Sequence, residues 1–171
     1  FIVQSSEGTN SVQMNAEVNG NVWFVQNLKL GSSADEEIMA LDRLKTKKEA
    51  VIDVRKFQLQ NNFEKDSLAT IKLTKHNVTS LSYESNTVKK QFAVFSEIYY
   101  KDGWNAYIDG QLTPHYRVNY VLRGMEIPKG KHTIEFRFEP TIISKGNTIT
   151  LISYFMLLVI PVGWFFYKKK K

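Results

Sequence analysis

Three histidines, scattered carboxylates and a dense run of aromatic residues are the side chains of this sequence with the potential for catalysis or ligand binding. His76, His115 and His132 lie on three separate segments without metal-ligand spacing, and we interpret them as surface or strand histidines. The chain has no cysteine, which excludes a thiol nucleophile, disulfides and Cys-ligated metals. It also lacks a G-x-S-x-G motif and a phosphate-binding glycine loop. We therefore predict no catalytic residue, no cofactor site and no metal site in this chain.

Asp102 and Asp109 are a carboxylate pair of the kind that glycoside hydrolases use as their two acids. Each of them, however, directly precedes a glycine, and Asp-Gly is typical of turns. The second pair, Asp109-Gly110, predicts a two-residue type I′ hairpin turn, in which both central residues have positive φ. We favour the turn interpretation over catalysis for both aspartates.

Aromatic residues concentrate between positions 99 and 120, a composition that suits stacking on sugar rings. The cluster comprises Tyr99, Tyr100, Trp104, Tyr107, His115, Tyr116 and Tyr120. Alternation along a strand turns about half of such side chains inward. Since Trp104 shares a face with alanine and isoleucine, we predict that it is buried and that Tyr107 is exposed. The candidate ligand contacts are Tyr107, His115 and Tyr120.

Most of the remaining chain has the alternation of apolar and polar residues that predicts β-strands. The clearest case ends the domain, where Ile134, Phe136 and Phe138 alternate with polar residues. The strands are expected at 12–17, 21–30, 50–54, 68–75, 78–85, 91–100, 104–108, 116–122 and 132–139, bounded by turn-prone residues. Short strands at this spacing predict a mainly β fold, an antiparallel β-sandwich of jelly-roll or immunoglobulin-like type.

One short amphipathic helix is expected among these strands. Ser33 with Glu36 fits a capping box, acidic residues fill the first turn, and basic residues follow toward the C-terminal end. Ile38, Leu41 and Leu44 form one apolar stripe, so the helix is expected to lie on the edge of a sheet.

The chain ends in an apolar segment that predicts a membrane span. No charged residue occurs between Gly146 and Tyr167, and the twenty residues 148–167 form about 30 Å of helix, the thickness of a bilayer core. Trp164 and Tyr167 resemble an interfacial aromatic belt. The alternative is a buried core helix, which rarely runs so long without a charge. Pro161 is compatible with a span, since transmembrane helices tolerate proline.

The excess positive charge lies at the C-terminus. Lys168, Lys169, Lys170 and Lys171 supply four of the six net charges, so residues 1–167 carry 19 basic against 17 acidic side chains, a net +2. This distribution does not resemble the basic face of a nucleic-acid-binding protein. Lysines directly after a span favour a cytoplasmic C-terminus. We therefore expect an extracytoplasmic domain at 1–140, a connector at 141–147, a transmembrane helix at 148–167 and a cytoplasmic lysine tail at 168–171.

The first residues, FIVQSSEGTN, contain neither an initiator methionine nor the features of a signal peptide. Two explanations are open, a cleaved signal or earlier membrane segments of a longer polypeptide. The second is favoured.

The segment from Glu97 to Pro140 contains a Gly-Trp pair, an Asp-Gly hairpin, the run LRGMEIPKGKH and a strand that ends in proline. In these features it resembles the C-terminal part of the YfhO family of bacterial polytopic membrane proteins. The upstream NVWFV, followed by a helix with an acidic start, is also similar to that family, and so is the terminal span. The resemblance covers residues 21–167.

The resemblance implies a parent protein with many upstream transmembrane helices, related in architecture to glycosyltransferases that use polyprenyl-phosphate sugars. The catalytic acid or base of such enzymes lies between early helices, so this chain would be a non-catalytic accessory domain of a bacterial inner-membrane protein. That protein would act in cell-envelope glycan or glycolipid assembly. Its expected partners are membrane lipid, the upstream segments and a glycan or envelope protein. The alternative is a single-pass subunit whose sandwich binds a protein partner.

Overall fold

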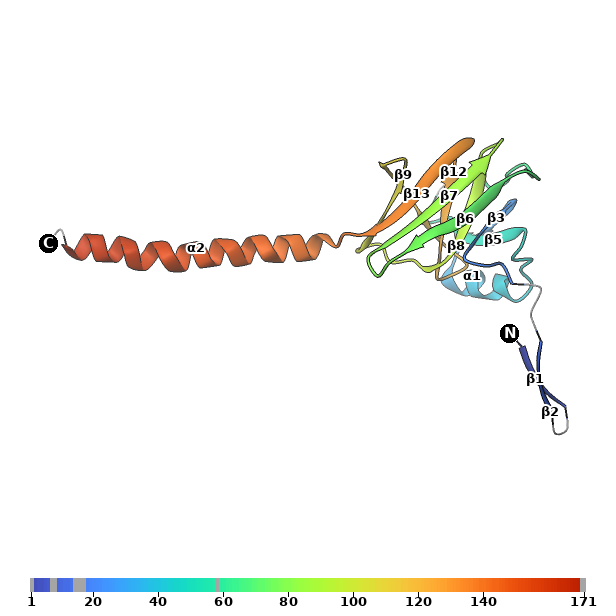
Figure 1. The fold of residues 1–171 in the computed structure, drawn as a ribbon, viewed down its shortest axis with the longest axis horizontal. Helices are drawn as coiled ribbons and strands as arrows, with labels where there is room; N and C mark the ends of the chain where they lie inside the picture. The colour runs from blue at the N-terminus through green and yellow to red at the C-terminus, as the bar shows by residue number, and fades with distance from the viewer. Residues whose placement is uncertain (1, 7–8, 14–17, 58, 170–171) are drawn as a thin grey trace.

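The computed structural model describes residues 2–6, 9–13, 18–57 and 59–169, arranged as a β-rich domain followed by one long helix (Figure 1). A hairpin of β1 (Ile2–Ser6) and β2 (Thr9–Gln13) precedes the domain. The end of the strand expected at 12–17 and the last two residues of the lysine tail, Lys170 and Lys171, lie outside the described residues.

Two sheets face each other, which confirms the predicted β-sandwich. The five-stranded sheet is antiparallel throughout and has the order β10 (Gln111–Thr113), β9 (Trp104–Ile108), β13 (Gly130–Phe138), β7 (Ser80–Thr87) and β6 (Thr70–His76). The six-stranded sheet has the order β3 (Val22–Val25), β8 (Gln91–Ile98), β12 (Leu122–Ile127), β11 (Tyr116–Val118), β5 (Glu49–Asp53) and β4 (Asn27–Gly31).

The six-stranded sheet departs from the expected antiparallel pattern at one edge. β4 and β5 pair in parallel, because helix α1 (Ala34–Leu41) carries the chain back before β5 begins. The strand expected at 21–30 is in fact two strands, β3 and β4, separated by Gln26. These two strands form opposite edges of the sheet, so the sheet curls until its edges meet at this residue.

Two apolar cores follow from this curl. The first lies between the sheets and includes Phe95 and Met125 from one sheet and Tyr83, Ile134 and Phe136 from the other. The second lies on the opposite face of the six-stranded sheet, where Phe63 packs against Val25, Leu28, Ala50, Ile52, Phe92, Val94 and Val118. Both faces of strand β8 are therefore buried, because its alternate side chains enter different cores, and its sequence is a continuous apolar run.

Helix α1 begins as predicted and buries a different side chain from the one expected. The Ser33 side chain accepts a hydrogen bond from the Glu36 backbone N–H, which confirms the N-cap. The return bond of Glu36 goes to the backbone and hydroxyl of Ser32, one residue earlier than the capping box requires. The expected apolar stripe is wrong for Ile38, which is 46% exposed, whereas Glu37 is fully buried.

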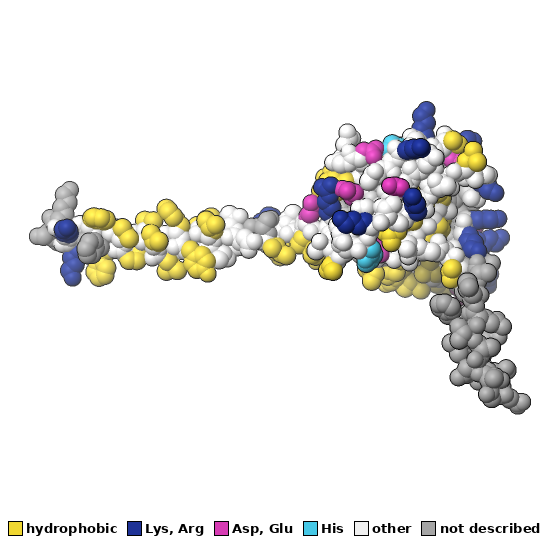
Figure 2. All heavy atoms as spheres, in the orientation of Figure 1, with side chains coloured by type: hydrophobic (Ala, Val, Ile, Leu, Met, Phe, Trp, Pro, Cys, Tyr) yellow, Lys and Arg dark blue, Asp and Glu magenta, His cyan; other side chains and the backbone are white. Residues whose placement is uncertain are grey.

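Helix α2 (Thr141–Lys169) leaves the sandwich directly after β13 and is long and apolar enough to cross a membrane (Figure 1). The residues of the expected connector, 141–147, form its first turns. No part of its apolar window is buried against the described residues, so α2 is not a core helix of this domain. Figure 2 shows hydrophobic side chains along the part of α2 that lies away from the domain. Trp164, Tyr167, Lys168 and Lys169 are exposed at its end.

The hairpin between β9 and β10 has the predicted type I′ turn, with φ of 50° at Asp109 and 81° at Gly110. A β-carbon at Gly110 would have no heavy atom within 4 Å, so a side chain there adds backbone strain without a clash. We expect Gly110→Val to lower the free energy of unfolding by about 1–3 kcal/mol. A denaturant melt of this variant measures that strain. Gly146→Val is the control, because a β-carbon at Gly146 also has no heavy atom within 4 Å and its φ is not in the left-handed region. Equal stability of the Gly110→Val variant and the unmutated chain would contradict this backbone strain.

The predicted facing of β9 is confirmed only in part. Ala106 and Ile108 are buried in the first core, so Trp104 does belong to the inward face. Trp104 itself is only partly buried, because it begins the strand at the open end of the sandwich, where Arg123 and Phe138 cover its ring. Tyr107, which we expected to be exposed, is also half-buried.

Candidate functional site

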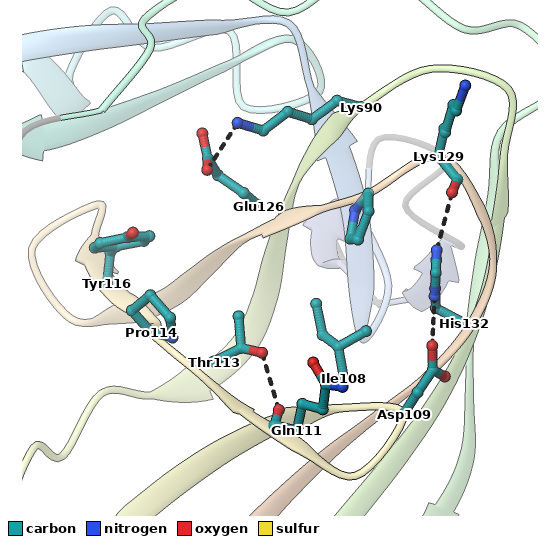
Figure 3. Close-up of a pocket in the computed structure, with 11 residues that line it drawn as sticks. Lys90, Ile108, Asp109, Gln111, Thr113, Pro114, Tyr116, Glu126, Lys129 and His132 are labelled. Atoms are coloured by element: carbon teal, nitrogen blue, oxygen red, sulfur yellow. Dashed lines mark hydrogen bonds and ion pairs between the residues drawn. The ribbon is translucent and has the colours of Figure 1, made fainter.

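A cleft of about 630 Å³ lies at one end of the sandwich (Figure 3). We call it the hairpin cleft, because the β9–β10 hairpin and the β12–β13 turn form its walls. The lining residues are Lys90, Ile108, Asp109, Gln111, Thr113, Pro114, Tyr116, Glu126, Pro128, Lys129 and His132.

The hairpin cleft lies at the end of the domain away from α2. Its residues Lys129 and His132 flank the start of β13, and the other end of that strand leads directly into α2. The nine residues of β13 extend for about 30 Å. The cleft therefore begins at the end of the sandwich away from α2, and its other side reaches Thr113, which pairs with Ala106 opposite Phe136.

One wall of the cleft contains a histidine that bridges two turns. His132 Nδ1 lies 2.6 Å from Asp109 Oδ2, and its Nε2 lies 3.0 Å from the Lys129 carbonyl oxygen. Carbonyl and carboxylate oxygens only accept hydrogen bonds, so this geometry suits an imidazolium that donates from both nitrogens. Accordingly, the hydrogen bond to Asp109 raises the pKa of His132, and the same bond lowers the pKa of Asp109.

Asp109 is held to the neighbouring strand as well as to the histidine. Its second carboxylate oxygen accepts a hydrogen bond of 2.9 Å from the Thr133 backbone N–H, and its own N–H donates to the Thr133 carbonyl at 2.9 Å. These bonds explain why a non-glycine residue occupies the positive-φ position of this turn. They also fix the carboxylate at the rim of the cleft.

The opposite wall combines an ion pair with a rigid aromatic ring. Lys90 Nζ lies 2.9 Å from Glu126 Oε2, and both side chains remain partly exposed. Tyr116 packs edge-on against Phe57 at 5.5 Å and stacks on Phe92 at 6.5 Å between centroids. Burial raises the pKa of Tyr116, so its hydroxyl stays protonated at neutral pH.

Together these walls suit an uncharged polar ligand with many hydroxyl groups. Carboxylates accept hydrogen bonds, lysines and amides donate them, and a fixed aromatic ring offers an apolar surface. Among the residues that the structure describes, no three His, Asp or Glu side chains lie close enough to hold a metal ion.

The aspartate pair considered for glycoside hydrolysis is separated by β9. Asp102 precedes this strand and Asp109 follows it, and its five residues extend for about 16 Å. The two carboxyl groups of glycosidases lie no more than about 10 Å apart. The structure therefore supports the turn interpretation for Asp109.

Tyr107 and His115, two of the three ligand contacts predicted from sequence, lie on opposite sides of the five-stranded sheet. Tyr107 is on the outer face, where its hydroxyl donates to Glu139 Oε2 at 2.7 Å, and this bond raises its pKa. The His115 ring packs against Phe136 of the first core at 5.6 Å. Burial lowers the pKa of His115 to about 4, so it is neutral at physiological pH.

Tyr120, the third predicted contact, belongs to the loop between β11 and β12. Its φ is 69°, and its backbone N–H donates to the Glu37 carboxylate at 2.8 Å. Arg117 lies over its ring at 5.3 Å. The structure thus places the three predicted contacts in three different surroundings, and their binding of a ligand stays a prediction.

Sequence reasoning missed Lys90 and Glu126 and interpreted His132 as a surface or strand histidine. It placed Tyr116 in the aromatic cluster but did not choose it as a ligand contact. A usable signal was present, because the sequence contains both the Asp109-Gly110 turn and the turn-prone segment Pro128-Lys129-Gly130. Strands β9 and β13 are antiparallel neighbours, with Ile134 opposite Ile108, which brings the two turns to the same end.

The His132 bridge predicts a specific pH dependence. A raised histidine pKa stabilises the fold below about pH 6.5, and this contribution disappears as pH rises through the folded-state value. We expect Asp109→Asn to return the pKa of His132 toward 6.5, since the carboxylate partner is lost. An NMR titration of the imidazole resonances measures it, with His76 as the internal control. An unchanged His132 pKa in this variant would contradict the bridge.

A comparison with models of protein families gives a match. The family model described as "Bacterial membrane protein YfhO" matches residues 6–150, which is most of the domain and the first part of α2. The searches of curated proteins and of solved structures found no match.

Proposed function

Because the chain belongs to the YfhO family of bacterial membrane proteins, we propose that it is a non-catalytic accessory domain that binds a glycan in cell-envelope assembly. In this proposal α2 anchors the domain in the inner membrane, and the catalytic machinery of the parent protein, a relative of polyprenyl-phosphate-sugar glycosyltransferases, lies in other segments. The hairpin cleft then holds the acceptor or product glycan.

The observation that carries this proposal is the composition of the hairpin cleft. A packed tyrosine, two carboxylates and two lysines line a space large enough for a short oligosaccharide. Its opening at the end away from α2 suits a polymer that extends from the membrane surface. The orientation supports the same view, since Lys168 and Lys169 after the span favour a cytoplasmic C-terminus and an extracytoplasmic domain.

Binding of envelope glycans by the detergent-solubilised chain tests the proposal. On a glycan array followed by calorimetry, we expect Glu126→Ala and Tyr116→Phe each to weaken binding about tenfold, because each removes one polar contact of roughly 1.4 kcal/mol. Tyr107→Phe is the matched control, since Tyr107 lies outside the cleft. Loss of binding in Tyr107→Phe alone would favour the contacts predicted from sequence. A protein that binds no glycan at all would contradict the proposal.

The second candidate is a single-pass subunit whose sandwich binds an envelope protein. Its support is the set of exposed apolar side chains on the domain, such as Leu112 on the cleft hairpin, which is 68% exposed. The length of the native polypeptide separates the two candidates. Many spans before Phe1 support the accessory domain, and a signal peptide directly before Phe1 supports the single-pass subunit.

A further inference from the structure

Exposed apolar side chains gather at the end of the sandwich from which α2 leaves. We call this set the proximal rim. It consists of Ile98, Tyr100, Val121 and Phe138, which are 70%, 51%, 47% and 37% exposed. Figure 2 shows hydrophobic side chains at the junction of the domain with α2. Solvent-exposed apolar groups next to a membrane helix suggest a surface that water does not cover in the native setting.

Backbone contacts hold the segments of the proximal rim next to one another. Ile98 lies opposite Leu122 in the ladder between β8 and β12, and the Tyr99 backbone N–H donates to the Val121 carbonyl at 2.8 Å. A β-carbon at Gly103 would lie 2.7 Å from the Tyr100 ring and 2.4 Å from the Phe138 ring. Gly103 therefore allows these two rings to approach each other.

The chain length between the rim and the span places the rim at the level of the lipid headgroups. The Gly103 carbonyl accepts a hydrogen bond of 2.7 Å from the Glu139 N–H, two residues before α2 begins. From Thr141 to the uncharged segment at Gly146, the helix rises about 8 Å. The headgroup region on one side of a bilayer is about 5–8 Å thick. The rim thus lies within reach of this layer.

The residue types around the rim also suit a lipid surface. Tyrosine and tryptophan favour the membrane interface, and Tyr100 and Trp104 both lie at this end. Lys101 and Lys145 are exposed and have no ion-pair partner among the residues that the structure describes. One acid, Asp102, lies beside Lys101.

A cationic pocket opens beside the rim. Its volume is about 580 Å³, and it is lined by Lys56, Phe57, Tyr99, Lys101 and Arg117, without a carboxylate. Two of these cations already have acidic partners: Lys56 lies 3.5 Å from Asp53, and Arg117 lies 2.8 Å from Glu37. Lys101 is therefore the cation of this pocket best placed to contact a lipid phosphate.

We propose that the proximal rim rests in the headgroup layer of the membrane that α2 crosses, with Lys101 in contact with lipid phosphates. The rim side chains then enter the interface, and the domain stands on the bilayer with the hairpin cleft facing away from it. This inference does not depend on glycan binding, since it uses a different end of the domain.

The absence of cysteine from the chain allows a direct test with single spin labels. The full chain is reconstituted in vesicles of phosphatidylcholine alone or mixed with phosphatidylglycerol, and a nitroxide is attached at Val121→Cys or at Leu112→Cys. Leu112 is the control, because it is 68% exposed on β10 and pairs with Tyr107, which lies three residues, about 10 Å, along β9 from Trp104 at the rim. Collision with oxygen, which concentrates in lipid, is compared with collision with a water-soluble nickel complex.

We expect a several-fold higher ratio of oxygen to nickel collisions at position 121 than at position 112. In vesicles with phosphatidylglycerol, Lys101→Glu should lower the ratio at position 121 toward the control, and an unchanged ratio there would overturn the phosphate contact. Equal ratios at the two positions would overturn the docking. A label at position 121 that neither reagent reaches would show that protein, and not lipid, covers the rim, which also overturns it. Circular dichroism checks that each labelled chain is folded.

Discussion

Replacement of Glu37 by alanine is expected to lower the free energy of unfolding by about 3–5 kcal/mol. The side chain is fully buried at the start of α1, where Oε2 accepts from Arg117 Nη2 at 2.8 Å and Oε1 accepts from the Tyr120 N–H at 2.8 Å. Loss of the carboxylate leaves a partly buried guanidinium and a backbone N–H without a partner. The positive φ of Tyr120 also loses its support.

A denaturant melt measures this loss, and Glu36→Ala is the matched control. Glu36 is the adjacent residue on the same helix, but it is exposed and its carboxylate bonds to Ser32 at the helix start. We expect that variant to lose about 1 kcal/mol, the usual cost of a removed cap interaction. If both variants lose the same free energy, the buried pair does not hold the loop between β11 and β12 to α1.

Phe136→Ala is expected to have a comparably large effect, about 3–5 kcal/mol, for a different physical reason. This ring is fully buried between the two sheets, with Phe95 at 4.9 Å and Tyr83 at 6.1 Å between centroids. Arg123 also lies 5.0 Å from the ring centroid. Truncation of such a side chain loses its transfer free energy and leaves a cavity that the two sheets cannot close.

Phe138→Ala provides the control for this prediction, because it removes the same ring two residues further along β13. Phe138 is 37% exposed and contacts Trp104 at the edge of the sandwich. We expect its loss to cost less than half as much. Thermal or denaturant unfolding of both variants compares the two positions directly. A cost at Phe138 equal to that at Phe136 would mean that the end of the sandwich is as tightly packed as its centre.

The hairpin cleft and the proximal rim lie at opposite ends of β13, which suggests a division of tasks within the domain. In our proposals the rim contacts lipid, and the cleft contacts a glycan beyond the bilayer surface. Asn105 and Tyr107 both donate to Glu139, just before Pro140 and α2. This network ties the outer face of the sheet to the start of the span.

Several features were predictable from the sequence because they depend on neighbouring residues. The type I′ turn follows from Asp109-Gly110, the start of α1 from Ser33, and the apolar helix α2 from an uncharged run. Many strand positions followed from the period-two pattern, and the sandwich followed from their number and spacing. The strand expected at 116–122 is wrong, because positive φ at Asn119 and Tyr120 breaks it into β11 and the start of β12. The family was recognisable for the same reason, since its motifs are turns and strand ends within one continuous segment.

Only the tertiary structure decided which residues meet across long stretches of chain. Glu37 was indistinguishable from the other acids of its helix, and its burial depends on Arg117, 80 residues away. The parallel pairing of β4 and β5 depends on the path of α1, which periodicity does not encode. Likewise, the hairpin cleft exists because two turns meet at one end of the sandwich, and the predicted contacts Tyr107 and His115 separate because their strand and loop face opposite sides of a sheet. The local sequence pattern indicates how each segment folds. Which side chains are buried, and which residues contact one another, depends on how the sheets assemble.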